Sequence, residues 1–66
     1  MNSAKLKGKM KECDKTYKEC ADILDISLTS YSNKVNGITD FKLDEAKKLS
    51  DFLGCNTQET VDIFLT

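Results

Sequence analysis

The chain has 66 residues and a formal net charge of −1 at pH 7, with 39% apolar and 32% charged residues. A chain of this length forms a single domain, here residues 1–66, and buries only about 60% of the surface of its unfolded chain. No stretch approaches the roughly 20 apolar residues of a membrane span, and the N-terminus lacks the apolar segment of a signal peptide. We therefore expect a small cytoplasmic protein. Because it has no proline and only three glycines, it should be all-helical.

The residues that usually carry chemistry are too few or wrongly spaced for an enzyme. The chain has no histidine, and Cys13, Cys20 and Cys55 lack the spacing of zinc ligands. Its glycines are isolated, so no phosphate-binding loop is present. Asp44 and Glu45 are expected to begin a helix, where the helix dipole favours acids. We expect no enzymatic activity, metal, cofactor or small-molecule ligand.

The first predicted helix covers residues 2–13. Leu6, Met10 and Cys13 recur at i, i+4 and i+7, which places them on one apolar stripe. Lysines surround the rest of this helix. A break is expected at residues 14–15.

The second predicted helix begins with the pattern Thr16-x-x-Glu19. This pattern is typical of a capping box, in which each side chain accepts a hydrogen bond from the backbone amide of the other residue. Residues 25–26 should form a short turn after it. The expected buried face consists of Cys20, Ala21 and Leu24.

Residues 27–36 have poor intrinsic helix propensity, because serine, threonine and asparagine side chains compete for backbone hydrogen bonds. A third helix is nevertheless predicted here. Ser27 is a good N-cap, Tyr31 and Val35 share one apolar face, and Gly37 is a good helix terminator after Asn36. The opposite face carries Leu28, Thr29, Ser32 and Asn33.

A loop at residues 38–42, with Phe41 as a core anchor, should lead into a fourth helix at residues 43–53 that Gly54 ends. The predicted apolar stripe of this helix is Leu43, Ala46, Leu49 and Leu53.

A fifth helix is predicted at residues 57–64, because Asn56 and Glu59 have the spacing of a second capping box. Val61, Phe64 and Leu65 form an apolar cluster close to the C-terminus.

Only a short turn separates the second and third helices, so they must cross steeply, as in a helix-turn-helix. Residues 16–37, TYKECADILDISLTSYSNKVNG, resemble the helix-turn-helix core of the Xre or Cro/repressor family of phage-type transcription regulators. Asp25 stands where glycine is common in that family, and Tyr17 where glutamine is common. Residues 41–54 and 56–66 are similar to the last two helices of short members from low-GC Gram-positive bacteria and their phages. The resemblance implies a compact five-helix, lambda-repressor-like bundle and a sequence-specific regulator that binds a double-stranded DNA operator.

The exposed face of the third helix is the predicted base-reading surface. Asn33 can pair with adenine, Thr29 and Ser32 can hydrogen-bond base edges, and Leu28 can contact a thymine methyl group. Because the chain has no arginine for guanine contacts, we expect mostly A·T base pairs at the positions read directly. The alternative is that these residues form an ordinary solvated face.

Contacts to DNA phosphates are expected around this surface, because phosphate contacts position the protein on the duplex. Lys5 and Lys9 of the first helix are additional candidates. The main predicted phosphate contacts are Thr16, Tyr17, Ser27, Lys34, Asn36 and Lys42.

Helix-turn-helix proteins commonly bind two half-sites as dimers. We therefore expect a homodimer. The candidate interface residues are Ile38, Val61, Phe64 and Leu65, although these side chains could instead cover the core.

The charge distribution leaves a second function open. Residues 1–18 carry six lysines against two acids, whereas residues 43–66 carry two lysines against five acids. A polarised domain of this kind can present a positive face to a polyanion, although a lysine-rich helix is more simply a solvated one. The acidic pI of about 5.2 and the lack of arginine favour the alternative, a protein-interaction module such as an antirepressor or an antitoxin-like partner.

Overall fold

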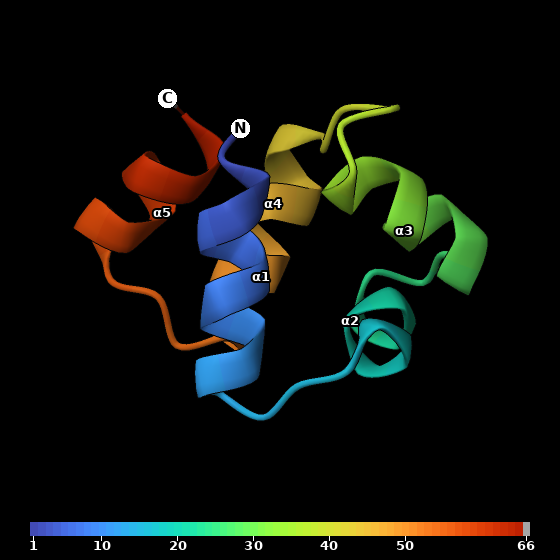
Figure 1. Cartoon of the computed structure of the whole chain (residues 1–66), viewed down its shortest axis with the longest axis horizontal. Coiled ribbons are helices and arrows are strands. Elements are labelled where there is room, and N and C mark those ends of the chain that lie inside the picture. Colours follow the sequence, from blue (N-terminus) through green and yellow to red (C-terminus); the bar gives the residue numbers. More distant parts are fainter. Residues whose placement is uncertain (66) are drawn as a thin grey trace.

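A computed structural model of the protein describes residues 1–65, which contain five α-helices and no strand (Figure 1). The termini lie close together at one end of the molecule, beside the loop between the third and fourth helices. The predicted all-helical fold is confirmed. The helices are α1 (Ser3–Glu12), α2 (Tyr17–Ile23), α3 (Leu28–Val35), α4 (Leu43–Phe52) and α5 (Thr57–Phe64).

Four of the helices begin with a polar side chain that accepts a hydrogen bond from a backbone amide of the first turn. Both predicted capping boxes are present, at Thr16 with Glu19 and at Asn56 with Glu59. Helix α4 differs, because lysine has no side-chain acceptor. There only the reverse bond forms, from the Lys42 amide to Glu45 Oε1 at 2.8 Å.

Four helices end in the same backbone motif, in which a residue of left-handed conformation follows the C-cap. Its amide, and the amide of the next residue, bond back to the last turn of the helix. Gly37 and Gly54 hold this position after α3 and α4, as predicted, with φ of 79° and 68°. Asp14 and Asp25 hold it after α1 and α2, each with φ of 57°.

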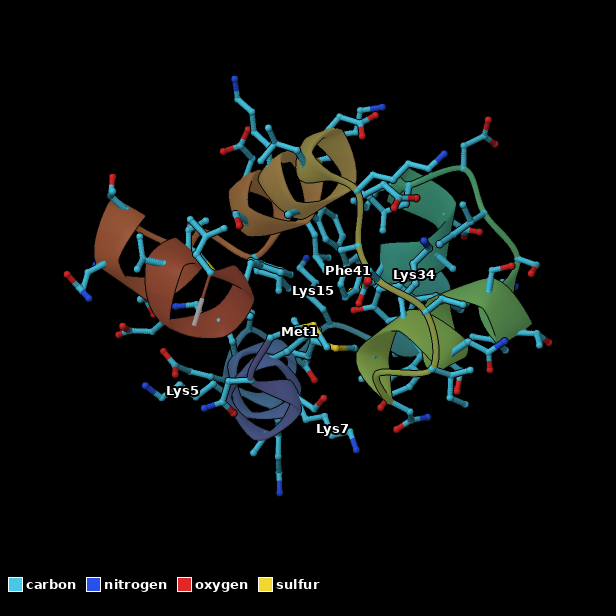
Figure 2. All side chains as sticks on the ribbon, turned by 90° about the horizontal axis from the view of Figure 1, so that it is seen from above. Met1, Lys5, Lys7, Lys15, Lys34 and Phe41 are labelled. Atoms are coloured by element: carbon cyan, nitrogen blue, oxygen red, sulfur yellow. The ribbon has the colours of Figure 1, made fainter. Side chains whose placement is uncertain are left out.

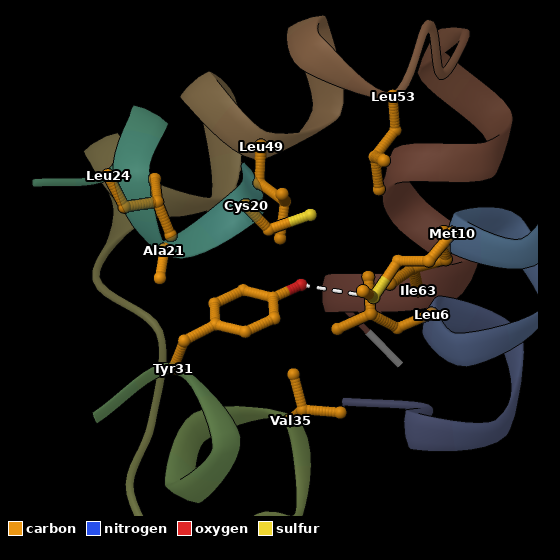
Figure 3. Packing of buried hydrophobic residues seen from close by; sticks show 10 residues of the cluster. All are labelled: Leu6, Met10, Cys20, Ala21, Leu24, Tyr31, Val35, Leu49, Leu53 and Ile63. Carbon is orange, nitrogen blue, oxygen red and sulfur yellow. Dashed lines mark hydrogen bonds between the residues drawn. The ribbon is translucent and has the colours of Figure 1, made fainter. Parts of the chain in front are cut away.

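Tyr31 lies fully buried at the centre of the core (Figure 3). Its hydroxyl group donates a hydrogen bond to Met10 Sδ at 3.2 Å. Its ring also packs edge-on against Tyr17 and Phe41, with ring centroids 5.5 and 6.0 Å away. One aromatic side chain of α3 therefore joins α1, α2 and the loop before α4. The buried cluster consists of Leu6, Met10, Cys20, Ala21, Leu24, Tyr31, Val35, Leu49, Leu53 and Ile63.

The predicted apolar stripe of α4 is wrong at Leu43, whose side chain is 81% exposed. Each three-residue step along an α-helix falls about 60° short of a full turn. Two such steps, from Leu43 through Ala46 to Leu49, therefore turn Leu43 away from the buried face. At the other end of the chain, Ile63 enters the core, although the predicted C-terminal cluster did not include it.

Candidate nucleic-acid interface

Helices α2 and α3 pack against each other across residues 24–27 (Figure 1). Asp25 reverses the chain in its left-handed conformation, and the amide of Ile26 bonds to the carbonyl of Ala21. Ser27 then caps α3 by accepting a hydrogen bond from the Ser30 amide at 3.1 Å. These contacts define a helix-turn-helix whose second helix lies at the edge of the molecule.

The four predicted base-reading residues lie on the first two turns of α3, and none of them belongs to the buried core. Tyr31 and Val35 of the same helix are fully buried. Helix α3 and its two caps carry no acidic side chain, so no like charge on this helix would repel a phosphate backbone. Leu28 and Thr29 are exposed, whereas Ser32 and Asn33 are half-buried.

The predicted phosphate contacts at the helix starts are the N-caps of α2 and α3. The hydroxyl oxygens of Thr16 and Ser27 each accept a hydrogen bond from a backbone amide of the helix. Both residues are exposed, and Tyr17 is half-buried beside them, with its ring against Tyr31. The starts of the two helices therefore present polar groups to solvent.

Two further predicted phosphate contacts lie near the end of α3. Asn36 is exposed, and its side-chain amide donates to the Ser32 hydroxyl at 3.3 Å. Lys42 is also exposed, immediately before α4, and no ion pair of its ammonium group is present within residues 1–65. Lys42 is therefore a cation that could approach a phosphate.

Lys34 is placed differently from Lys42. Its ammonium group lies 3.1 Å from Glu45 Oε1 and donates to the Asp40 carbonyl at 3.0 Å. The side chains of Lys34 and Glu45 are only 13% and 12% exposed. The Lys34 ammonium group is therefore bound within the protein, although the sequence predicted that it would contact a DNA phosphate.

Burial raises the pKa of the Glu45 carboxyl group, but its hydrogen bonds outweigh this effect. The Lys42 amide and the Lys34 ammonium group together hold that pKa below its usual value. Glu45 therefore stays ionised at neutral pH. Sequence reasoning recognised it only as a residue of the first helical turn, because its partner lies on another helix.

The α1 lysines divide into two sets. Lys9 lies 2.7 Å from Glu59, and Lys5 lies 3.9 Å from Asp62, so both are directed toward α5. The hydrogen bond to Glu59 raises the pKa of Lys9. Lys7 projects from the side of α1 nearer to α3 (Figure 2). It is therefore better placed than Lys5 or Lys9 to extend a positive surface beside α3.

The predicted dimer residues are not equally exposed. Ile38 and Leu65 are 71% and 66% exposed, whereas Val61 and Phe64 are half-buried. Phe64 packs edge-on against Phe41 with a centroid distance of 5.4 Å, so it also covers the core. Leu43, Phe64 and Leu65 line two hollows of about 440 and 580 Å³ beside α4 and α5, and Val61 lines the smaller one.

Within residues 1–65, no group of three or more histidine, cysteine or acidic side chains could hold a metal ion. The three cysteines are free, and burial raises the pKa of the Cys20 and Cys55 thiols. The Cys13 thiol donates to the Leu53 carbonyl at 3.0 Å. None of the five helices is long and apolar enough to cross a bilayer.

A family model described as helix-turn-helix matches residues 6–59, which is most of the chain. The chain therefore belongs to this helix-turn-helix family, whose members are DNA-binding regulators. Searches of curated proteins and of solved structures found no match.

Proposed function

We propose that this protein is a sequence-specific transcription regulator of the Cro/repressor type that binds a double-stranded DNA operator in the cytoplasm. The observation that carries the proposal is the exposed surface of α3, which is polar apart from Leu28, free of acids and presented by the second helix of a helix-turn-helix. Such a helix lies in the major groove and contacts base edges. Binding DNA through this helix would need no cofactor.

Each side chain of this face has a role in the proposal. The side-chain amide of Asn33 would accept one hydrogen bond from adenine and donate another to it, and Leu28 would contact a thymine methyl group. Thr29 and Ser32 would hydrogen-bond base edges. The operator would therefore be read mainly at A·T base pairs.

The phosphate contacts in the proposal surround this face. Thr16, Tyr17 and Ser27 would hold one backbone at the starts of α2 and α3. Asn36 and Lys42 would hold the other side of the groove. Lys34 is left out of this set, because its ammonium group is engaged by Glu45.

The proposal includes a homodimer, since two recognition helices about 34 Å apart would read successive half-sites. The exposed apolar side chains Ile38 and Leu65 support this assembly, with Val61 and Phe64 beside Leu65. Bound to its operator, the dimer would act by steric exclusion of RNA polymerase.

The test is selection of duplexes from a random library at low salt, followed by affinity measurements on the enriched sequence. Asn33→Ala should relax the preference at one base pair by ~1–3 kcal/mol. Asn36→Ala is the matched control, because loss of a phosphate contact should weaken binding to every sequence alike. If no duplex is enriched, the chain is not a sequence-specific DNA binder, and the protein-interaction alternative takes its place.

A further inference from the structure

The end of α3 is joined to α4 by one compact polar cluster. Glu45 Oε1 accepts from the Lys42 amide at 2.8 Å and lies 3.1 Å from Lys34 Nζ. Lys34 also donates to the Asp40 carbonyl at 3.0 Å. Three segments therefore meet at one carboxylate: the last turn of α3, the loop after it, and the first turn of α4.

This cluster connects the last turn of α3 with the first turn of α4. Helix α3 packs against α2 and α1, and its backbone does not approach α4 closely. The Ile38 and Thr39 amides bond to the Asn33 carbonyl, and Tyr31 contacts Phe41, but these contacts end within the loop. The pair formed by Lys34 and Glu45 reaches α4 itself. Both charged side chains are largely buried, so breaking the pair would leave an uncompensated charge there.

We propose that Lys34 and Glu45 are positioning residues for DNA binding, which fix the recognition helix relative to the loop and to Lys42. This inference rests on the proposed function. Asn33 and Ser32 lie within two residues of Lys34, and Lys42 bonds to Glu45 directly. The ion pair therefore couples the base-reading surface to a proposed phosphate contact, although neither charged group needs to touch DNA.

Glu45→Gln tests this proposal, because the glutamine side chain can still accept from the Lys42 amide. The substitution removes a negative charge, so electrostatics alone would strengthen binding to every duplex. The positioning role instead predicts weaker binding to the selected duplex, by about tenfold, the equivalent of one well-placed base contact. Binding to a scrambled duplex of equal length should stay the same or tighten.

Lys34→Met provides a second variant, with Lys48→Met on α4 as the control for loss of one exposed lysine. Lys34→Met should weaken binding to the selected duplex more than to the scrambled one, whereas Lys48→Met should leave their ratio unchanged. Urea unfolding of each variant identifies conditions under which all are folded. If Glu45→Gln itself does not fold, the Lys34→Met ratio decides the question.

Two results would overturn this inference but not the proposed function. In the first, Glu45→Gln binds the selected duplex as tightly as the wild type does. In the second, Lys34→Met loses affinity equally for the selected and the scrambled duplex. The second result would make Lys34 a phosphate contact. If the wild-type protein enriches no duplex at all, the proposed function fails as well, and the two failures are thereby distinguished.

Discussion

At the scale of single residues, two aspartates hold backbone positions that usually take glycine. Asp14 and Asp25 adopt φ of 57° at the ends of α1 and α2. The left-handed conformation costs an L-residue roughly 1 kcal/mol, less for aspartate than for most residues. A carboxylate at a helix C-terminus also opposes the helix dipole.

Asp25→Gly should therefore stabilise the protein by about 0.5–1 kcal/mol, measured as the free energy of unfolding in urea. Asp22→Gly is the matched control, because Asp22 is exposed inside α2. Its stability should change little, because the lower helix propensity of glycine is offset by removal of a carboxylate from the last turn of α2. Loss of stability in Asp25→Gly would show that the Asp25 side chain has a stabilising contact role at the turn.

The sequence predicted single-residue roles correctly where those roles depend on neighbours a few positions away in the chain. The caps at Thr16, Ser27 and Asn56 follow from the chemistry of one side chain and an amide three residues away. The environment of Lys34 did not follow, because its partner Glu45 lies eleven positions along the chain on another helix. Only the folded arrangement brings that pair together.

At the scale of elements, α3 depends on its ends and its neighbours more than on its own propensity. Ser27 satisfies an amide at its start, and Gly37 supplies the left-handed residue at its end. Tyr31 and Val35 anchor its inner face in the core. A helix rich in serine and asparagine is therefore held in place while its outer face stays polar.

Ser27→Ala should cost about 1 kcal/mol of unfolding free energy, because the Ser30 amide would lose its capping acceptor. Ser30→Ala is the control, because Ser30 is exposed on the same turn and its hydroxyl group accepts a hydrogen bond from Ser27 Oγ at 3.0 Å but caps no backbone amide. The free energy of unfolding should change less than half as much in Ser30→Ala as in Ser27→Ala. Equal effects of the two substitutions would contradict a capping role for Ser27.

The bounds of the helices were predictable because capping residues and left-handed glycines mark them in the sequence. Which face a short helix buries was less predictable. Leu43 follows the apolar spacing of α4 but lies beyond the contact with the core, and Ile63 rather than its neighbours enters it. In helices of two or three turns, a shift of one residue changes the buried face.

At the scale of the whole molecule, stability is coupled to pH by the carboxyl groups with lowered pKa values, of which residues 1–65 contain three. Hydrogen bonds at Thr16 lower the pKa of Glu19, and the hydrogen bond from Lys9 lowers that of Glu59. The pKa of Glu45 is lowered despite burial, by Lys42 and Lys34. The unfolded chain, with glutamate pKa values of about 4.3, therefore binds protons more readily than the folded one.

Stability should be constant from neutral pH to about pH 5 and then fall as the pH drops through these values. The measurement is urea unfolding at pH 7, 5 and 3. Glu45→Gln should reduce the acid-dependent loss, because one of the three carboxyl groups is removed. An increase in stability from pH 5 to pH 3 would contradict the assigned ion pairs and caps.

The charge distribution bears on function at this same scale. The acids of α5 bind Lys5 and Lys9, so α1 and α5 partly neutralise each other on one side. Lys7 and Lys42 stand outside these pairs. The sequence alone indicated a polarised chain, but only the folded structure separates the lysines that are paired from those that could meet DNA.

Salt dependence of binding to the selected duplex tests the central claim most directly. If a dimer binds through α3 with Lys42 of each subunit near phosphate, affinity should fall with salt at a log–log slope of about −2 or steeper. The preference over a scrambled duplex should persist at every salt concentration. Equal affinity for the two duplexes, or no binding at low salt, would contradict the proposal that α3 reads an operator.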